Sequence, residues 1–282
     1  MSAPAVLISA DMEGTTGAAT PDDVAPDTTS WAGASRCWIA DVNAVVGALF
    51  AHGAGEVIVT DAHGSGASLD PSQIDPRAGL IRGVPRTFGM LEGIDGGVQA
   101  VVFLGYHGTA GSGGVLSHAF MAAGIHTLRV NGQPAGEGTV NAQLASAFGV
   151  PVLLVSGDEA ACAEAASYAP QAERVVTKQA LARFTARLRP AASVRAELAA
   201  AVESGLARLA AGTLAAPARS PELCAEIEFS GENLALAASA IPGVRRTGLR
   251  SVRYTCADAP EWYRCLGAIW TLARAAQRGR YG

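Results

Sequence analysis

Apolar runs alternate with helix-length segments along the first half of the chain. Four continuous apolar runs have the length of buried strands: residues 6–10, 56–60, 100–105 and 150–156. Between them, residues 36–52 and 138–148 carry apolar side chains at helical spacing, and a glycine suited to end a helix follows each segment. This alternation predicts an α/β fold with a mostly parallel sheet flanked by helices.

The second half of the chain has a less regular pattern. Besides a strand at residues 126–130 of the first half, strands are expected at residues 223–229 and 247–254. Helices are expected at residues 158–168, 178–188, 193–211, 232–240 and 259–277. Asn131-Gly132 predicts a hairpin turn after the first of these strands. We expect two lobes: residues 1–157, and a smaller α/β lobe at residues 158–282 that completes a cleft and provides oligomer contacts.

Carboxylate and imidazole side chains follow the predicted strands at their C-terminal ends. Asp11 and Glu13 come after the first strand. Residues two apart in an extended chain point to the same side, roughly 6–7 Å from each other, so these carboxylates need a compensating cation. Asp61 and His63 follow the second strand, and His107 follows the third. Because ligands bind at the carboxyl ends of parallel strands, we predict a metal site there, suited to zinc, manganese or iron.

Two further residues are candidates on weaker grounds. His118 follows a glycine-rich stretch that can bend the chain toward the sheet, and it is a ligand, an acid–base group or a loop residue. Glu137 begins the helix at residues 138–148, where the helix dipole favours a carboxylate without any metal. His52 and His126 are expected at a helix end and in a strand, outside the site.

Composition and charge exclude several classes of protein. The 282-residue chain has a net charge of −4 and no basic block, which argues against nucleic-acid binding. No apolar run approaches the roughly 18 residues of a membrane span, and the N-terminus has no basic segment of a signal peptide. The five cysteines form no C-x-x-C pair, which favours a reducing, cytoplasmic setting.

Motif absences narrow the chemistry further. The chain has no G-x-S-x-G elbow and no H-E-x-x-H helix, which argues against serine hydrolases and the common zincins. Its glycines are not followed by G-K-[ST], so they do not form a phosphate loop. Asp61 is expected either to orient His63 or to cap its own turn, and Lys178 is expected on the surface.

Five short segments have a specific order along the chain. They are Ser9-Ala10-Asp11-Met12-Glu13-Gly14, Asp61-Ala62-His63, Phe103-Leu104-Gly105-Tyr106-His107, Leu116-Ser117-His118 and Gly136-Glu137. In this order the chain resembles the DppA-like zinc D-aminopeptidases over almost its whole length. The resemblance implies two zinc ions per chain. Asp11 would bridge both, Glu13 and His63 would complete one site, and His107 and Glu137 would complete the other.

The resemblance also implies an activity. His118 matches the family's catalytic histidine and would assist a metal-bound hydroxide as it attacks an amide carbonyl. The substrate would be a short peptide or an aminoacyl amide, cut at its N-terminal amide bond with a preference for D-amino acids. Family members form homo-decamers with an enclosed chamber, so a homo-oligomer is expected. Three alternatives stay open: an amidase of a non-peptide small molecule, a non-catalytic ligand-binding protein and a metal-dependent phosphoesterase.

Overall fold

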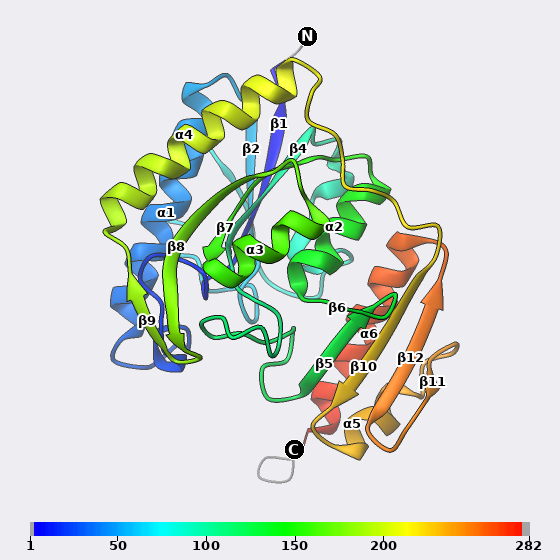
Figure 1. Cartoon of the computed structure of the whole chain (residues 1–282). Coiled ribbons are helices and arrows are strands. Elements are labelled where there is room, and N and C mark those ends of the chain that lie inside the picture. Colours follow the sequence, from blue (N-terminus) through cyan, green and yellow to red (C-terminus); the bar gives the residue numbers. More distant parts are fainter. Residues whose placement is uncertain (1–2, 278–282) are drawn as a thin grey trace.

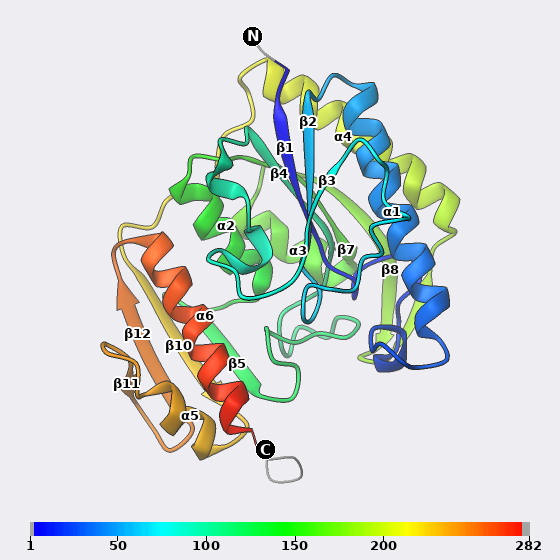
Figure 2. The same cartoon turned by 180° about the vertical axis from the view of Figure 1, so that it is seen from behind.

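The computed structural model describes residues 3–277, and Figures 1 and 2 show it from opposite sides. Seven strands form the main sheet, in the order β3-β2-β1-β4-β7-β8-β9. Their bounds are β1 Ala5–Ala10, β2 Glu56–Asp61, β3 Gly79–Ile81, β4 Ala100–Tyr106, β7 Val152–Asp158, β8 Glu173–Ala182 and β9 Thr185–Leu188. Only β8 and β9 are antiparallel neighbours in this sheet. The predicted α/β class with a mostly parallel sheet is confirmed.

Helices cover both faces of the main sheet (Figure 1). They are α1 Trp31–Ala51, α2 Glu137–Ala147, α3 Glu159–Tyr168 and α4 Ala191–Ala210. Val6 and Ile8 of β1 pack in a core with residues of α1 and α4, whereas Leu7 packs in a core with residues of α2 and α3. Successive side chains of a strand point to opposite faces, so a strand covered on both faces is apolar throughout.

Helix α1 is long and apolar enough to cross a membrane by length and composition alone. Half of its most apolar stretch is buried inside the protein. Trp38, Val42 and Val45 are fully buried and pack in the core beneath the main sheet. This burial is typical of a core helix in a globular domain.

A smaller antiparallel sheet lies beside the main one (Figure 2). Its order is β11-β12-β10-β5-β6. The bounds of its strands are β5 Ile125–Val130, β6 Gln133–Pro134, β10 Leu223–Phe229, β11 Arg245–Arg246 and β12 Ser251–Cys256. The helices that follow β10 and β12 are α5 Glu232–Ala238 and α6 Ala259–Ala276. Single-turn helices occur elsewhere in the chain, at Pro21–Asp23, Gly89–Leu91 and Ile94–Gly96. Trp262 and Leu266 of α6 share one hydrophobic core with Phe103 of β4, so the two layers are packed together.

The helix predicted at residues 178–188 is wrong. This segment forms the C-terminal half of β8, a turn and β9. Residues 178–182 pair with β9 in an antiparallel hairpin, which extends the part of β8 that pairs with β7. This sheet pairing outweighs the helical preference of the Ala and Leu residues in the segment. Lys178 is also not on the surface, because its side chain is fully buried.

Each of the two layers contains segments from both sides of residue 157. Strands β5 and β6 come from the first half of the chain and join the antiparallel sheet, whereas β8, β9 and α4 come from the second half and join the main-sheet layer. A division of the chain after Gly157 therefore stays a prediction about folding units, and it does not follow the boundary between the sheets.

Strand order determines where a ligand can bind. Strands β2 and β3 follow β1 in sequence and lie on one side of it in the sheet, whereas the next strand, β4, lies on its other side. A reversal of this kind opens a crevice at the carboxyl ends of the strands. A cavity of about 1080 Å³ lies at this edge, lined by residues of the strand-end loops and of helix α6.

Candidate metal centre

The five predicted ligands come together at the carboxyl edge of the main sheet. Asp11 and Glu13 follow β1, which lies between β2 and β4. His63 follows β2 and His107 follows β4, so the two imidazoles approach from opposite sides. Glu137 is the first residue of α2. All five side chains are buried, with exposed fractions between 3% and 7%.

Two glycines allow the Asp11 segment to lie directly against β4. The backbone N–H of Asp11 donates to the Leu104 carbonyl, and that of Gly14 donates to the Gly105 carbonyl, both at 2.8 Å. A Cβ atom at Gly14 would lie 1.9 Å from the Tyr106 carbonyl oxygen, and Gly105 has a φ of +72°. Glycine is therefore required at both positions for the two ligand-bearing segments to meet.

Asp11, Glu13 and His63 form the first group of potential metal ligands. The Nδ1 atom of His63 lies 3.0 Å from Glu13 Oε2 and 3.5 Å from Asp11 Oδ1. The Trp38 ring packs against the imidazole in a T-shaped arrangement, with ring centroids 5.9 Å apart. One nitrogen and two carboxylate oxygens therefore converge in a site with a hydrophobic wall.

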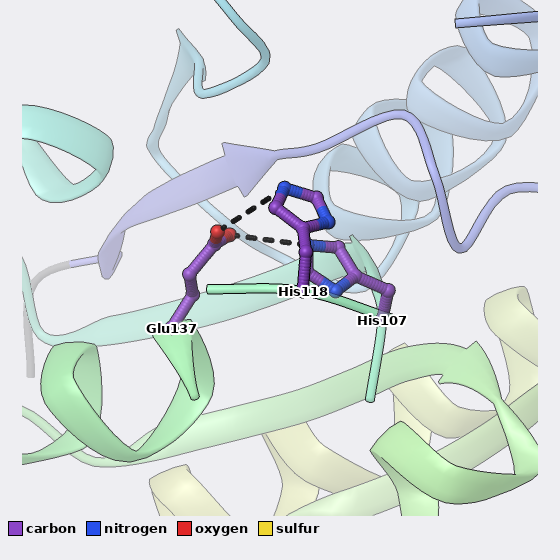
Figure 3. Close-up of side chains that lie close together, drawn as sticks. All are labelled: His107, His118 and Glu137. Carbon is purple, nitrogen blue, oxygen red and sulfur yellow. Dashed lines mark ion pairs between the residues drawn. The ribbon is translucent and has the colours of Figure 1, made fainter. Parts of the chain in front are cut away.

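His107, Glu137 and His118 form the second group (Figure 3). The Nε2 atom of His107 lies 3.3 Å from Glu137 Oε2, and that of His118 lies 3.7 Å from Glu137 Oε1. The two imidazole rings are stacked, with centroids 4.1 Å apart and planes 11° apart. Asp11 completes this group from the other side, since its Oδ2 lies 3.6 Å from His107 Nε2.

The geometry fits a pair of zinc ions that share Asp11. Ligand atoms 2.0–2.1 Å from a tetrahedral zinc lie about 3.3 Å from each other, and the distances from His63 and His107 to the carboxylates are 3.0–3.6 Å. Within residues 3–277, Asp11 Oδ2 and His107 Nε2 are buried without a hydrogen-bond partner. A cation between these two atoms would satisfy both.

Backbone carbonyls determine which imidazole nitrogens face the carboxylates. His63 Nε2 lies 2.8 Å from the Val24 carbonyl, and His107 Nδ1 lies 3.0 Å from the Gly108 carbonyl. A carbonyl only accepts, so these nitrogens carry the hydrogens, and the opposite nitrogens direct a lone pair at the carboxylates when the rings are neutral. Such outer hydrogen bonds are typical of metal-binding histidines.

Electrostatics at the site reflect the crowding of charge. Burial opposes protonation of His63 and His107, but the neighbouring carboxylates outweigh it and raise both pKa values, that of His107 to about 10. Burial, followed by repulsion from Glu13, raises the pKa of Asp11 well above its usual range. Burial also opposes ionisation of Glu13 and Glu137, but the histidines hold both pKa values below the usual range. In the metal-free protein, protons on the imidazoles therefore compensate the carboxylates.

His118 differs from the other two histidines in its environment. Burial, followed by repulsion from His107, lowers its pKa. Its Nδ1 donates to the Leu116 carbonyl at 2.8 Å, so Nε2 is the basic nitrogen and lies toward Glu137. A neutral imidazole at the edge of the site is suited to proton transfer, and the same position is also within reach of a metal ion.

Lys178 is a site-supporting residue that the sequence did not indicate. Its Nζ donates to the backbone carbonyl of Glu13 at 2.6 Å and also to that of Ala18, so it holds the loop that carries a ligand. Burial lowers its pKa to about 8. The neighbouring Thr177 hydroxyl donates to the Gly14 carbonyl at 2.6 Å. If β8 had been predicted as a strand of the main sheet, Lys178 and Thr177 would have been candidates for contact with the metal-site loop.

Asp61 caps its own turn and does not contact His63 through a hydrogen bond. Its Oδ2 accepts from the backbone N–H groups of Ser68 and Leu69, at 2.6 and 2.7 Å. His52 and His126 are exposed and lie outside the site, as expected. The five histidines and the four acidic residues considered from sequence are thereby separated into site and non-site positions by their hydrogen bonds and burial.

Paired imidazole–carboxylate groups beside a large cavity are typical of a metal-dependent hydrolase. The chain belongs to the D-aminopeptidase family: the model of family Peptidase M55, described as D-aminopeptidase, matches residues 5–268. A D-aminopeptidase of Bacillus subtilis is 31% identical over 271 residues, which cover 95% of this chain and 97% of that protein. Membership makes the chain a zinc metallo-aminopeptidase, a hydrolase that acts on peptide bonds.

A solved structure supports the same assignment. It is the Zn-dependent D-aminopeptidase DppA from Bacillus subtilis, which is described as a self-compartmentalizing protease. The two chains superpose with a TM-score of 0.90 at 28% identity, over 96% of this chain and 98% of DppA. The whole fold, including the small antiparallel sheet, is therefore shared.

Proposed function

We propose that this chain is a di-zinc aminopeptidase that cuts the N-terminal amide bond of short peptides or aminoacyl amides, with a preference for D-residues. Asp11 would bridge both ions, Glu13 and His63 would hold one, and His107 and Glu137 would hold the other. The observation that carries this proposal is the position of Asp11, whose two oxygens face His63 and His107 at 3.5 and 3.6 Å. The Asp11 carboxylate would then be a ligand in both groups, the one with His63 and the one with His107.

The zinc ions would supply a water of lowered pKa and a positive charge for the developing oxyanion. The residues of the chain have separate tasks. The carboxylates of Glu13 and Glu137 line the cavity and can bind the free amine of a substrate. His118 presents a basic Nε2 to the same cavity, so it can accept a proton during attack and return it to the leaving amine.

A binding and turnover experiment tests the proposal. The purified protein is loaded with zinc, the zinc per chain is counted, and hydrolysis is measured for alanine dipeptides of all four stereochemistries and for aminoacyl amides. N-acetylated dipeptides and a phosphate ester are the controls. Two zinc ions per chain and cleavage that requires a free amine support the proposal. Cleavage of the phosphate ester alone, or no bound zinc, contradicts it.

His118 is tested separately. His118→Ala is expected to retain both zinc ions and to lose turnover by about 10²–10⁴-fold, the usual contribution of a positioned acid–base group. The exposed His126 provides the matched control, and His126→Ala is expected to keep both properties. Loss of one zinc ion from His118→Ala would make His118 a ligand.

The proposal also includes an oligomeric state and a cellular location. DppA is described as self-compartmentalizing, and we infer that this chain also forms a homo-oligomer, a decamer by family resemblance. Light scattering is expected to give a mass near ten times the 28.6 kDa of one chain, and a monomer would contradict this. The five free thiols support a reducing, cytoplasmic setting, which cell fractionation tests.

A further inference from the structure

The loop that carries His118 has an unusual backbone. Residues 115–121, here called the histidine segment, connect the glycine-rich stretch after β4 to the start of β5. Leu116 and Phe120, on either side of His118, have φ values of 54° and 51°. Bulky residues rarely adopt this left-handed conformation, and they keep it only where surrounding contacts impose it. The contacts that impose it therefore determine where His118 lies.

The hairpin between β8 and β9 holds the N-terminal end of the histidine segment. The backbone N–H of Leu116 donates to the Arg183 carbonyl at 2.7 Å. In return, the Nε of Arg183 donates to the Ser117 carbonyl at 3.2 Å. Arg183 lies in the turn between the two strands, so a reciprocal pair of hydrogen bonds connects this turn to the residues directly before His118.

Helix α6 holds the C-terminal end of the histidine segment. The Phe120 ring is stacked on the Trp270 ring, with centroids 4.5 Å apart and planes 14° apart. One turn further along α6, Nη2 of Arg274 donates to the Phe120 carbonyl at 3.2 Å. The backbone N–H of Phe120 donates to Glu137 Oε1 at 2.7 Å. Phe120 is thereby connected to helix α6 on one side and to a proposed metal ligand on the other.

We propose that Arg183, Trp270 and Arg274 are positioning residues that hold His118 at the metal centre. His118 lies between two ends that are fixed from different parts of the fold, and it has no regular secondary structure of its own. The other site residues follow strands or begin a helix; Glu137 accepts from the Phe120 N–H, but its own position is set by helix α2. The inference rests on the catalytic role proposed above for His118.

The expected consequence is a loss of turnover without a loss of metal. A displacement of about 1 Å at a catalytic group costs up to roughly 10²-fold in rate. Trp270→Leu, Arg274→Met and Arg183→Ala are each expected to lower kcat by about 10- to 100-fold, with KM and zinc content unchanged. Trp270→Phe and Arg274→Lys keep the stacking ring and the cationic donor, and they are expected to recover most of the activity.

Controls come from the same elements. Leu272 is a partly exposed residue of α6 that does not line the cavity, and Arg187 is an exposed arginine of β9. Leu272→Ala and Arg187→Met are expected to behave as the wild type. Steady-state kinetics, zinc content and amide hydrogen exchange of residues 115–121 are measured for every variant. Exchange is also measured on the metal-free protein, so one readout does not depend on activity.

The outcomes separate the inference from the proposed function. Lower kcat together with faster amide exchange in residues 115–121, at unchanged zinc content, supports the positioning role. A rise in KM at unchanged kcat would overturn it and make Trp270 or Arg274 a substrate contact. Unchanged exchange in all three variants would also overturn it. If the wild type hydrolyses no amide, the proposed function fails, whereas exchange still decides whether these contacts hold the segment.

Discussion

Asp11→Asn is the substitution that most directly tests the shared carboxylate. Asparagine keeps the size of the side chain, but it removes the negative charge and replaces one ligand oxygen with an NH₂ group. A zinc site with four ligands contributes about 10–16 kcal/mol of binding free energy, or roughly 3 kcal/mol per ligand. Since 1.4 kcal/mol is a factor of ten, the loss of one ligand corresponds to about 100-fold in affinity.

The arrangement of oxygens predicts different results for two neighbouring carboxylates. Asp11 Oδ1 faces His63 and Asp11 Oδ2 faces His107, so Asp11→Asn is expected to weaken both zinc positions by about 100-fold. Glu13 faces His63 at 3.0 Å and belongs to one group, so Glu13→Gln is expected to weaken one position only. The exposed Asp95 supplies the control, Asp95→Asn, with wild-type binding expected.

Equilibrium dialysis against a series of buffered free-zinc concentrations measures both positions. Zinc per chain is plotted against free zinc, and the wild type is expected to reach two. For Asp11→Asn the whole curve moves to higher free zinc, whereas for Glu13→Gln only the second step moves. The reasoning is refuted if Asp11→Asn weakens one position and leaves the other at wild-type affinity, because the lost negative charge would be shared by both zinc ions.

Three further predictions concern protons, backbone and support. The pKa values of His63 and His107 are raised in the fold, so their protonation stabilises the metal-free protein fully below the unfolded pKa near 6.5, and this stabilisation is lost as pH rises, toward about 10 for His107. Zinc must displace both protons, so zinc affinity should rise with pH. Calorimetry in buffers of different ionisation enthalpy counts the released protons. A pH-independent affinity would contradict this assignment. Gly14→Ala puts a methyl group 1.9 Å from a backbone carbonyl oxygen, so it should lower both the melting temperature and zinc content in thermal and metal assays; a wild-type melting temperature would show that the loop can move away. Lys178→Met removes the ammonium that donates to the Glu13 carbonyl, and we expect about a 10- to 100-fold loss of zinc affinity at one position, with two wild-type affinities as the opposing result.

The convergence of the ligands was predictable because parallel sheets have a common edge. Asp11, His63 and His107 are separated by about fifty residues in each case, yet each follows a strand, and the neighbouring strands of a parallel sheet end together. Burial on both faces also made β1 and β4 recognisable as continuous apolar runs. Local pattern and global topology agreed in this part of the chain.

Residues that act through long-range contacts were not predictable. Lys178 has the composition of a surface residue, and its burial depends on two carbonyls more than 150 positions away in the chain. Residues 178–188 were assigned as a helix because Ala and Leu residues dominate the local pattern, whereas pairing between β8 and β9 determines the structure. The contacts of Phe120 with Trp270 and Arg274 likewise join segments about 150 residues apart.

The backbone carbonyls that receive hydrogen bonds from His63, His107 and His118 have a consequence for how the centre tolerates mutation. Each acceptor is a main-chain oxygen, of Val24, Gly108 and Leu116, so no acceptor side chain is required at these three positions. The tautomer of each ring therefore depends on the course of the backbone. At Gly108 that course excludes a larger side chain, because a Cβ atom would lie 2.4 Å from Ser112 Oγ. Substitutions that preserve the loop backbone would leave the same nitrogen facing the carboxylates, whereas substitutions that displace a loop would not.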